Sequence, residues 1–186
     1  EDRRVKMTKI ILKNALIEIM RTKPIHEISI KKICEVADIN RSTFYHHYST
    51  PYELYDDIIN DVSDDINAIL ENHRECSTSL TEYLTELLTY ADKKRDFFLV
   101  ILSDKGNIGI GEKLTTIVSK FIGLNNNTEL MMYCTQFLSA GLINILWLWL
   151  NNENKLPPER IAEVITTIMM QGVKSVFAPH NSGDSH

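Results

Sequence analysis

Apolar residues recur at helical spacing along almost the whole chain, and this pattern predicts an all-helical protein. The first periodic stretch runs from about Val5 to Thr22. It ends at Lys23, because the residue before Pro24 is disfavoured in helical geometry. The apolar stripe predicted to be buried consists of Ile10, Ile11, Ala15, Leu16, Ile19 and Met20.

Two short helices separated by a tight turn are predicted next, within residues 29–48. Ser29 is a good N-cap for the first of them. The apolar face of that helix consists of Ile30, Ile33, Val36 and Ala37. Asp38, Ile39 and Asn40 form the turn. We expect Ile39 to fill the gap between the two helices and Asn40 to cap the second helix.

The second short helix has two aromatic residues on one side and a polar face on the other. Phe44 and Tyr48 lie one turn apart and are expected to point inward. The polar face carries hydrogen-bond donors, aromatic rings and a cation, and no carboxylate: Arg41, Ser42, Thr43, Tyr45, His46 and His47. A helix-turn-helix presents such a helix to the major groove of DNA. The pattern alone leaves open an ordinary helical hairpin with a solvated face.

A long helix is predicted from about Pro51 to Asn72. Thr50 and Glu53 form a capping-box pattern, with Pro51 at the first helical position. The apolar stripe consists of Leu54, Ile58, Val62, Ile66, Ile69 and Leu70. The other side is expected to be a solvated acidic face of Asp56, Asp57, Asp61, Asp64 and Asp65. Because this helix should start against the helix pair and end in the rest of the protein, we expect it to act as a lever.

Five more helices are predicted, at about 77–92, 97–102, 112–122, 128–151 and from 157 onward. The helix at 128–151 is apolar nearly all round, so it should be covered by its own chain on one side and by another chain on the other. The homodimer interface is predicted to include Ala140, Gly141, Asn144, Leu148, Ile161, Ile165 and Met169. Residues 138–150 are strongly apolar but too short to span a bilayer, so no membrane association is expected.

Charge is distributed unevenly along the chain. Residues 1–50 hold ten Lys/Arg and six Asp/Glu, a net charge of +4, whereas the remainder carries −9. A basic first part on an acidic remainder is expected when only the first part meets DNA. Cys34, Cys76 and Cys134 are too far apart for a metal site and are expected to be reduced thiols in a cytoplasmic protein.

Catalytic motifs are not apparent in the sequence. It contains no nucleophile elbow, no P-loop and no His pair at metal-binding spacing. His46 and His47 are adjacent, so they diverge on a helix and cannot hold one ion. We therefore expect neither an enzyme nor a metal or cofactor site.

The run Ser42-Thr43-Phe44-Tyr45-His46-His47-Tyr48, followed by Leu54, resembles the recognition-helix signature of the TetR family of transcriptional regulators. Ala15 and Leu16, and the spacing of Ile30, Ile33 and Ala37, are similar to the same family. The resemblance covers roughly residues 3–60. Beyond them the chain resembles the family in length and helical pattern, and in the segment from Gly141 to Trp147.

The resemblance implies a helix-turn-helix domain at 1–50, a helical regulatory and dimerisation domain at 51–180 and a disordered tail at 181–186, with about nine helices in all. It implies contact with double-stranded operator DNA through Lys6, Lys9, Ser29, Ile30, Lys31, Asn40, Arg41, Ser42, Thr43, Tyr45, His46, His47 and Thr50. Many relatives carry a Lys where this chain has Pro51, so that phosphate contact is not expected here.

By the same resemblance, we expect a repressor that a small-molecule effector releases from a pseudo-palindromic operator. Candidate residues for an effector pocket are Tyr90, Phe98, Ile101, Leu102, Tyr133, Phe137 and Trp147. A transcriptional activator or a regulator controlled by a protein partner is the alternative within the family. A helical protein–protein interaction module without DNA binding is the alternative of another class.

Overall fold

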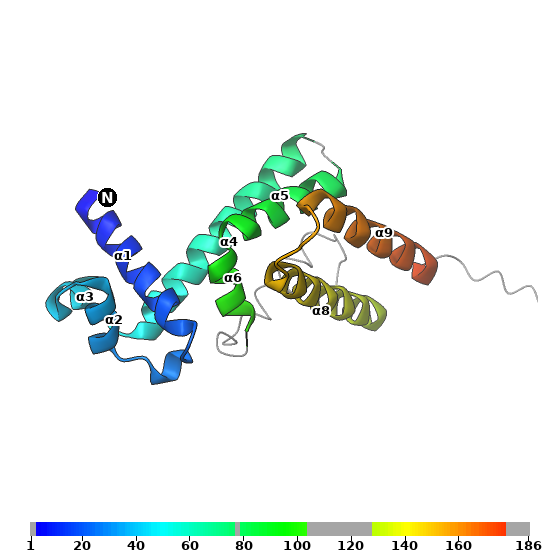
Figure 1. Cartoon of the computed structure of the whole chain (residues 1–186). Coiled ribbons are helices and arrows are strands. Elements are labelled where there is room, and N and C mark those ends of the chain that lie inside the picture. The colour runs from blue at the N-terminus through cyan, green and yellow to red at the C-terminus, as the bar shows by residue number, and fades with distance from the viewer. Residues whose placement is uncertain (1–2, 77–78, 104–127, 178–186) are drawn as a thin grey trace, which may run out of the picture.

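The computed structural model describes residues 3–76, 79–103 and 128–177, and every regular element in these ranges is helical (Figure 1). Its helices are α1 (Arg3–Met20), η1 (Ile25–Glu27), α2 (Ile30–Ala37), α3 (Arg41–His47), α4 (Pro51–Cys76), α5 (Leu80–Lys93), α6 (Arg95–Leu102), α8 (Glu129–Asn151) and α9 (Pro158–Phe177). The predicted all-helical fold is confirmed. The helix predicted at 112–122 and the tail predicted at 181–186 lie outside the described residues.

Helix α1 packs on α2 and α4 through one buried face, formed by Leu12, Ala15, Leu16, Ile19 and Met20. The predicted stripe is wrong at its start, because Ile10 and Ile11 are exposed and Leu12 is fully buried. Leu12 shares a helical face with Leu16 and Ile19, whereas Ile10 lies on the opposite side.

The turn between α2 and α3 is built by its backbone. Ser29 caps α2, since its hydroxyl accepts a hydrogen bond from the Lys32 N–H at 3.2 Å. Asp38 ends the helix in the left-handed conformation with φ of 52°, which a short polar side chain tolerates. Asn40 occupies the N-cap position of α3, but its side chain makes no capping hydrogen bond, contrary to expectation.

Helix α4 begins at Pro51 as predicted and continues to Cys76. The Thr50 hydroxyl accepts a hydrogen bond from the Glu53 N–H at 3.1 Å. The Glu53 carboxylate bonds the N–H of Ser49 at 2.6 Å, which differs from the reciprocal bond to Thr50 expected of a capping box. One orphan N–H group of the first helical turn, that of Glu53, and the N–H of Ser49 just before the helix are thus satisfied locally.

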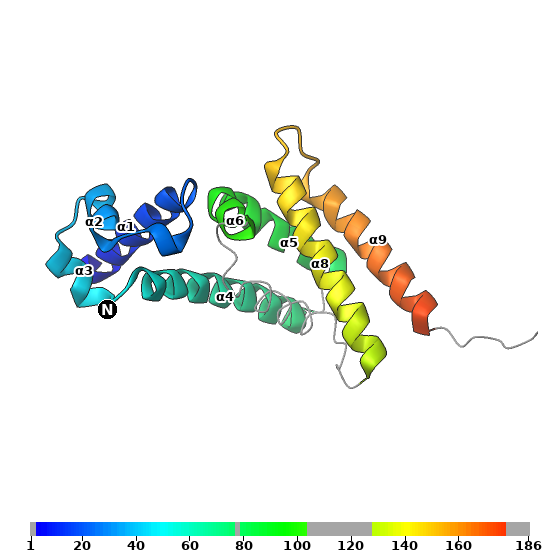
Figure 2. The ribbon, with the colours of Figure 1, turned by 90° about the horizontal axis from the view of Figure 1, so that it is seen from below.

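Two buried clusters divide the apolar core, and α4 contributes to both. The head cluster joins buried side chains of α1–α3 to the first turns of α4, as far as Ile59. The body cluster takes the later turns of α4, from Val62 onward, with α5, α6, α8 and α9. The head core therefore extends past residue 50, and α4 runs from the head into the body (Figure 2).

Helix α6 lies between the head and the other body helices (Figure 2). Val100 and Ile101 are buried in the head cluster, whereas Phe98 is buried in the body cluster. Asp96 at the start of α6 pairs with Arg21 at the end of α1, with 2.6 Å between the charged atoms. The head is thus held by α6 as well as by α4.

Helix α8 packs on α6 and α9 through one side and exposes large apolar side chains on the other. Phe137 is 76% exposed and Leu148 is 66% exposed. By length and composition alone, α8 is the one helix among the described residues that could cross a membrane. This is weak evidence, because an apolar helix of a soluble protein passes the same test.

Candidate nucleic-acid interface

Helix α3 is anchored by two aromatic side chains and leaves its remaining residues on the surface. Phe44 is fully buried, and the Tyr48 ring packs against it with 6.0 Å between ring centroids. Of the predicted contact residues, Arg41, Ser42, Tyr45 and His46 are exposed, whereas Thr43 and His47 are half-buried. The seven residues of α3 include no carboxylate, so its exposed face carries no charge that would repel phosphate.

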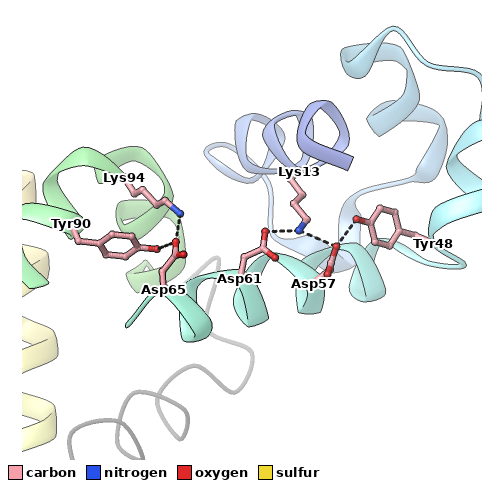
Figure 3. Close-up of polar contacts among 7 residues, drawn as sticks. All are labelled: Lys13, Tyr48, Asp57, Asp61, Asp65, Tyr90 and Lys94. Atoms are coloured by element: carbon pink, nitrogen blue, oxygen red, sulfur yellow. Dashed lines mark hydrogen bonds and ion pairs between the residues drawn. The ribbon is translucent and has the colours of Figure 1, made fainter. Parts of the chain in front are cut away.

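Polar contacts fix α3 relative to α4 and α1 (Figure 3). The Tyr48 hydroxyl donates a hydrogen bond of 2.6 Å to the Asp57 carboxylate. The Lys13 ammonium lies 2.9 Å from Asp57 and 2.6 Å from Asp61, one turn further along α4. These contacts join all three helices around a largely buried lysine.

The surroundings of Lys13 favour the charged forms of both Lys13 and Asp57. Burial alone would raise the pKa of Asp57, but the Tyr48 hydroxyl and the Lys13 ammonium outweigh it and lower the pKa. Burial would lower the pKa of Lys13, and the two aspartates outweigh it and raise the pKa. The contacts that position α3 are therefore ionic at neutral pH.

The other predicted DNA contacts surround α3 and are mostly accessible. Lys6, Lys31 and Asn40 are exposed, while Lys9 and Ile30 are half-buried. Lys31 lies 3.7 Å from the exposed Glu35 carboxylate, a surface pair that screening weakens. Ser29 and Thr50 are exposed, and each hydroxyl accepts a helix-capping bond while its own proton stays available for donation to a phosphate.

Of the five aspartates of α4, Asp57 is half-buried and the other four are exposed, so four of them agree with the predicted solvated face. Three of the five, Asp57, Asp61 and Asp65, recur every four residues and also bind side chains of neighbouring helices. One turn after Asp61, Asp65 accepts hydrogen bonds from Tyr90 at 2.7 Å and from Lys94 at 2.9 Å. The sequence signal for these contacts is that the three aspartates are spaced i, i+4, i+8 and therefore share one side of the helix. The side chains that bind them could not be predicted in this way, because they are distant in sequence.

The contacts of Asp65 with Tyr90 and Lys94 likewise favour the ionised form of the Asp65 carboxyl group. Hydrogen bonds from Lys94 and Tyr90 lower the pKa of Asp65. Burial raises the pKa of Tyr90 to about 12, so its hydroxyl keeps its proton at neutral pH. Tyr90 is therefore a hydrogen-bond donor to an ionised carboxylate.

An apolar cavity of about 120 Å³ lies in the body between α4, α5, α6, α8 and α9. Its walls are formed by Ile66, Leu84, Leu87, Leu88, Tyr90, Ala91, Phe98, Leu142, Ile143, Leu146 and Ile165. Of the seven predicted pocket residues, Tyr90 and Phe98 line it. Most of the other walls are aliphatic, and aliphatic residues at helical spacing look the same in sequence whether they line a cavity or fill a core.

The five remaining predicted pocket residues lie elsewhere. Ile101 belongs to the head cluster, and Leu102 packs on the body cluster without lining the cavity. Tyr133, Phe137 and Trp147 are 65%, 76% and 38% exposed, so the pocket prediction is wrong for them. Tyr133 and Phe137 lie on the outward side of α8, because the buried Thr135, Ser139 and Leu150 occupy its opposite side.

The predicted dimer residues fall into two groups. Ala140, Gly141, Asn144 and Leu148 are exposed on the outward side of α8. Ile165 and Met169 are 4% and 5% exposed and pack in the body cluster, and Ile161 packs against it half-buried. Ile165 and Met169 are thus not available to a partner, and the large apolar side chains exposed on α9 are Val164, Ile168 and Met170.

Within the described residues, no three His, Cys, Asp or Glu side chains lie together in a way that could hold a metal ion. Cys34 and Cys134 are free thiols. Burial raises the pKa of the Cys34 thiol, which disfavours the reactive thiolate.

Comparisons with known proteins agree with this architecture. Residues 78–171 match a TetR family model described as a transcriptional regulator C-terminal region. Comparison with curated protein sequences finds no match. The family match covers half of the chain and lies in the body, whereas the sequence resemblance described above lies in the head.

Solved structures of similar fold include a TetR transcriptional regulator from Streptococcus agalactiae 2603V. It has 21% identity and a TM-score of 0.67, over 90% of this chain and 96% of that one. A regulator of the TerR/AcrR family from Aquifex aeolicus VF5 has 20% identity and a TM-score of 0.57, over 91% and 99%. The regulator FadR from Bacillus subtilis, in complex with stearoyl-CoA, has 14% identity and a TM-score of 0.62, over 88% and 98%.

The helix-turn-helix, the lever-like α4, the helical body and the family match over residues 78–171 point to one conclusion. The chain belongs to the TetR family of transcriptional regulators.

Proposed function

We propose that this protein is a cytoplasmic homodimer that binds a pseudo-palindromic operator in double-stranded DNA through α3 of each protomer. The observation that carries the proposal is the exposed, carboxylate-free face of α3, held in place by Phe44 and by the Tyr48–Asp57 bond. A fixed helix with exposed donors suits the major groove. The net charge of +4 in residues 1–50 supports the approach of this end to DNA.

Within the interface, Arg41, Ser42, Thr43 and His46 are the proposed base-edge contacts, because the start of a recognition helix points into the groove. Tyr45 and His47 are proposed to hold phosphates, together with Lys6, Lys9, Lys31 and the capping region at Ser29 and Thr50. Phosphate contacts orient the protein, and base contacts select the sequence.

The proposed dimer is formed by the outward side of α8 with the exposed side of α9. Phe137, Leu148 and Ile168 are each more than half exposed in the single chain, and such a patch marks an interaction surface. A two-fold dimer places two heads in a symmetric arrangement, which matches a pseudo-palindromic operator.

We further propose that the protein is a repressor released by a small molecule held in the apolar cavity beside Tyr90 and Phe98. The physical support is that α4 contributes to both buried clusters, so a change in the body can reach the head. Among the similar folds, one protein is named the secondary repressor NalD of Pseudomonas aeruginosa, and another is named the operon activator DhaS. Activation is therefore the alternative mode, distinguished by the direction in which expression changes when the gene is removed.

The experiment that tests the function is selection of fragments from random double-stranded DNA by the purified protein. The expected result is enrichment of one motif with two inverted half-sites. The matched control is the Arg41→Ala variant, which should lose the preference at one position of each half-site. Absence of any enriched motif, together with a 1:1 complex with another protein, would instead favour a helical interaction module.

A further inference from the structure

Tyr90 is the one described cavity wall residue with a polar side chain. Its ring lies edge-on to Phe98, with 6.0 Å between ring centroids. Its hydroxyl donates a 2.7 Å hydrogen bond to Asp65 of α4. Tyr90 therefore joins the cavity to α4 through a polar contact, in addition to the direct apolar contact that Ile66 of α4 makes with the cavity.

Asp65 is also held by Lys94, whose ammonium lies 2.9 Å from the carboxylate and 4.9 Å from the centre of the Tyr90 ring. Tyr90, Lys94 and Asp65 form a closed set of contacts, named here the Asp65 cluster. Figure 3 shows it on the same side of α4 as the Lys13 contacts of Asp61 and Asp57. The two sets lie on neighbouring turns of α4, where the Lys13 contacts join it to the head and the Asp65 cluster joins it to the body.

We propose that Tyr90 is the residue that couples occupancy of the cavity to the position of α4, a proposal that rests on the ligand-controlled function proposed above. A small apolar ligand moves the Tyr90 ring, and the hydroxyl leaves Asp65. Because the hydroxyl is fixed to the ring, a ring shift of about 1 Å is enough to take the oxygen out of hydrogen-bond range. The middle of α4 then loses one contact with α5, while Lys94 still holds Asp65 and Lys13 still holds α4 to the head.

The size of the cavity indicates the size of ligand that it can take up. An apolar cavity of roughly 150 Å³ takes up benzene, and the cavity here is about 120 Å³. Phe98 is 4% exposed, whereas Tyr90 is half-buried and its hydroxyl bonds the exposed Asp65. Of the two aromatic walls, Tyr90 is the one that can move outward. The expected ligand class is uncharged and apolar, with a size near that of a single aromatic ring.

The first test is structural and uses benzene as the probe, without DNA. Crystals of the full chain are exposed to saturating benzene. We expect benzene beside Phe98 and a Tyr90 hydroxyl no longer bonded to Asp65. An empty cavity would overturn the proposal, and so would an occupied cavity with the Tyr90–Asp65 bond intact.

The second test measures operator affinity with and without benzene for the unmodified protein, Tyr90→Phe and Asp64→Asn. For the unmodified protein we expect benzene to weaken operator binding by about 5- to 150-fold, the usual range of such coupling. Tyr90→Phe keeps the ring but lacks the hydroxyl, so it should still bind benzene and lose most of the effect. Asp64→Asn removes an exposed charge one residue from Asp65 and should behave like the unmodified protein.

The outcomes separate this proposal from the function on which it rests. An equal benzene effect in the unmodified protein and in Tyr90→Phe would overturn the role of Tyr90 and leave operator binding standing. Failure to bind any operator without benzene would refute the proposed function, and the crystal experiment would then decide the role of Tyr90 alone.

Discussion

Tyr48 positions α3 with both parts of its side chain. The ring packs on Phe44, and the hydroxyl bonds the Asp57 carboxylate, which in turn lies beside Lys13. A charged hydrogen bond that also positions a helix is worth more than an exposed ion pair, because part of it is removed from water. In the proposed interface, recognition therefore depends also on residues that do not themselves face DNA.

We predict that Asp57→Asn destabilises the protein by about 1.5–3 kcal/mol near neutral pH, because hydrogen bonds to a charged group contribute about this much. The pKa of Asp57 in the folded protein is lower than its ordinary value of 3.8. Its contribution is therefore fully present above that value and is lost as the pH falls through the lower folded pKa. Denaturant unfolding at several pH values should show the difference shrinking below about pH 4.

The matched control for this measurement is Asp56→Asn, which removes the same charge from an exposed neighbour. Its effect should stay within about 0.5 kcal/mol, as for most surface changes. An Asp57→Asn effect that is independent of pH would show that the carboxylate charge is not what holds Tyr48 and Lys13.

At the α3 surface, we predict different effects for two substitutions. Arg41→Ala should cost about 1–3 kcal/mol of binding at one operator position, because Arg can pair with a guanine edge. Tyr45→Phe should weaken binding to all sequences alike, because a phosphate contact reads no base. Binding to a panel of single-base operator variants measures both. Identical profiles for Arg41→Ala and the unmodified protein would exclude base contact by Arg41.

At the scale of elements, α8 has two sides with different roles. One side packs on α6 and α9, and the outward side carries Phe137, Gly141 and Leu148. A Cβ atom added at Gly141 would meet nothing within 4 Å in the single chain. Gly141 is thus free to accept a side chain unless another helix lies against it.

We predict that Gly141→Asp gives a folded monomer, because the new carboxylate is harmless in the protomer and would be buried in the dimer. Sedimentation together with circular dichroism should show loss of the dimer with helicity retained. Asn154→Asp adds the same charge in the exposed loop after α8 and should leave the dimer intact.

Met169→Asp provides the contrast, because Met169 is buried in the protomer's own core. We expect this variant to lose its fold, since an unpaired charge cannot be buried there. A stable dimer of Gly141→Asp would place the interface elsewhere.

At the scale of the whole molecule, α4 links a basic head to an acidic body and carries two sets of polar contacts on neighbouring turns, one to the head and one to the body. A dimer must present two heads at fixed spacing, so any tilt of α4 changes the fit to both half-sites at once. The protein then has one arrangement of α4 that fits the operator and another that does not. A ligand can shift the equilibrium between these two arrangements only if it binds them with different affinities.

We therefore predict that an inducer binds the operator-bound dimer more weakly than the free dimer. The factor must equal the one by which the inducer weakens operator binding, because coupling between two binding sites is reciprocal. Calorimetric titration of the same inducer with and without operator measures it. Equal inducer affinities in the two titrations would exclude this mechanism for any ligand.

Much of the candidate interface could be predicted from sequence because it is encoded locally. Phe44 and Tyr48 are four residues apart, and their inward position follows from helical geometry. The cavity and the dimer surface could not be separated in the same way. Tyr133, Phe137 and Tyr90 are all aromatic residues on apolar helices, yet the first two are exposed and only Tyr90 lines the cavity.

The sequence by itself determined the helices, the helix-turn-helix and the face of α3, because periodicity, capping and turn residues act over a few positions. Tertiary structure alone decided that Asp57, Asp61 and Asp65 bind Lys13, Tyr48, Tyr90 and Lys94. It also decided that Ile165 and Met169 face the core. The physical reason is that a residue's own helix fixes only its direction around that helix. What it meets in that direction depends on how helices distant in sequence pack together.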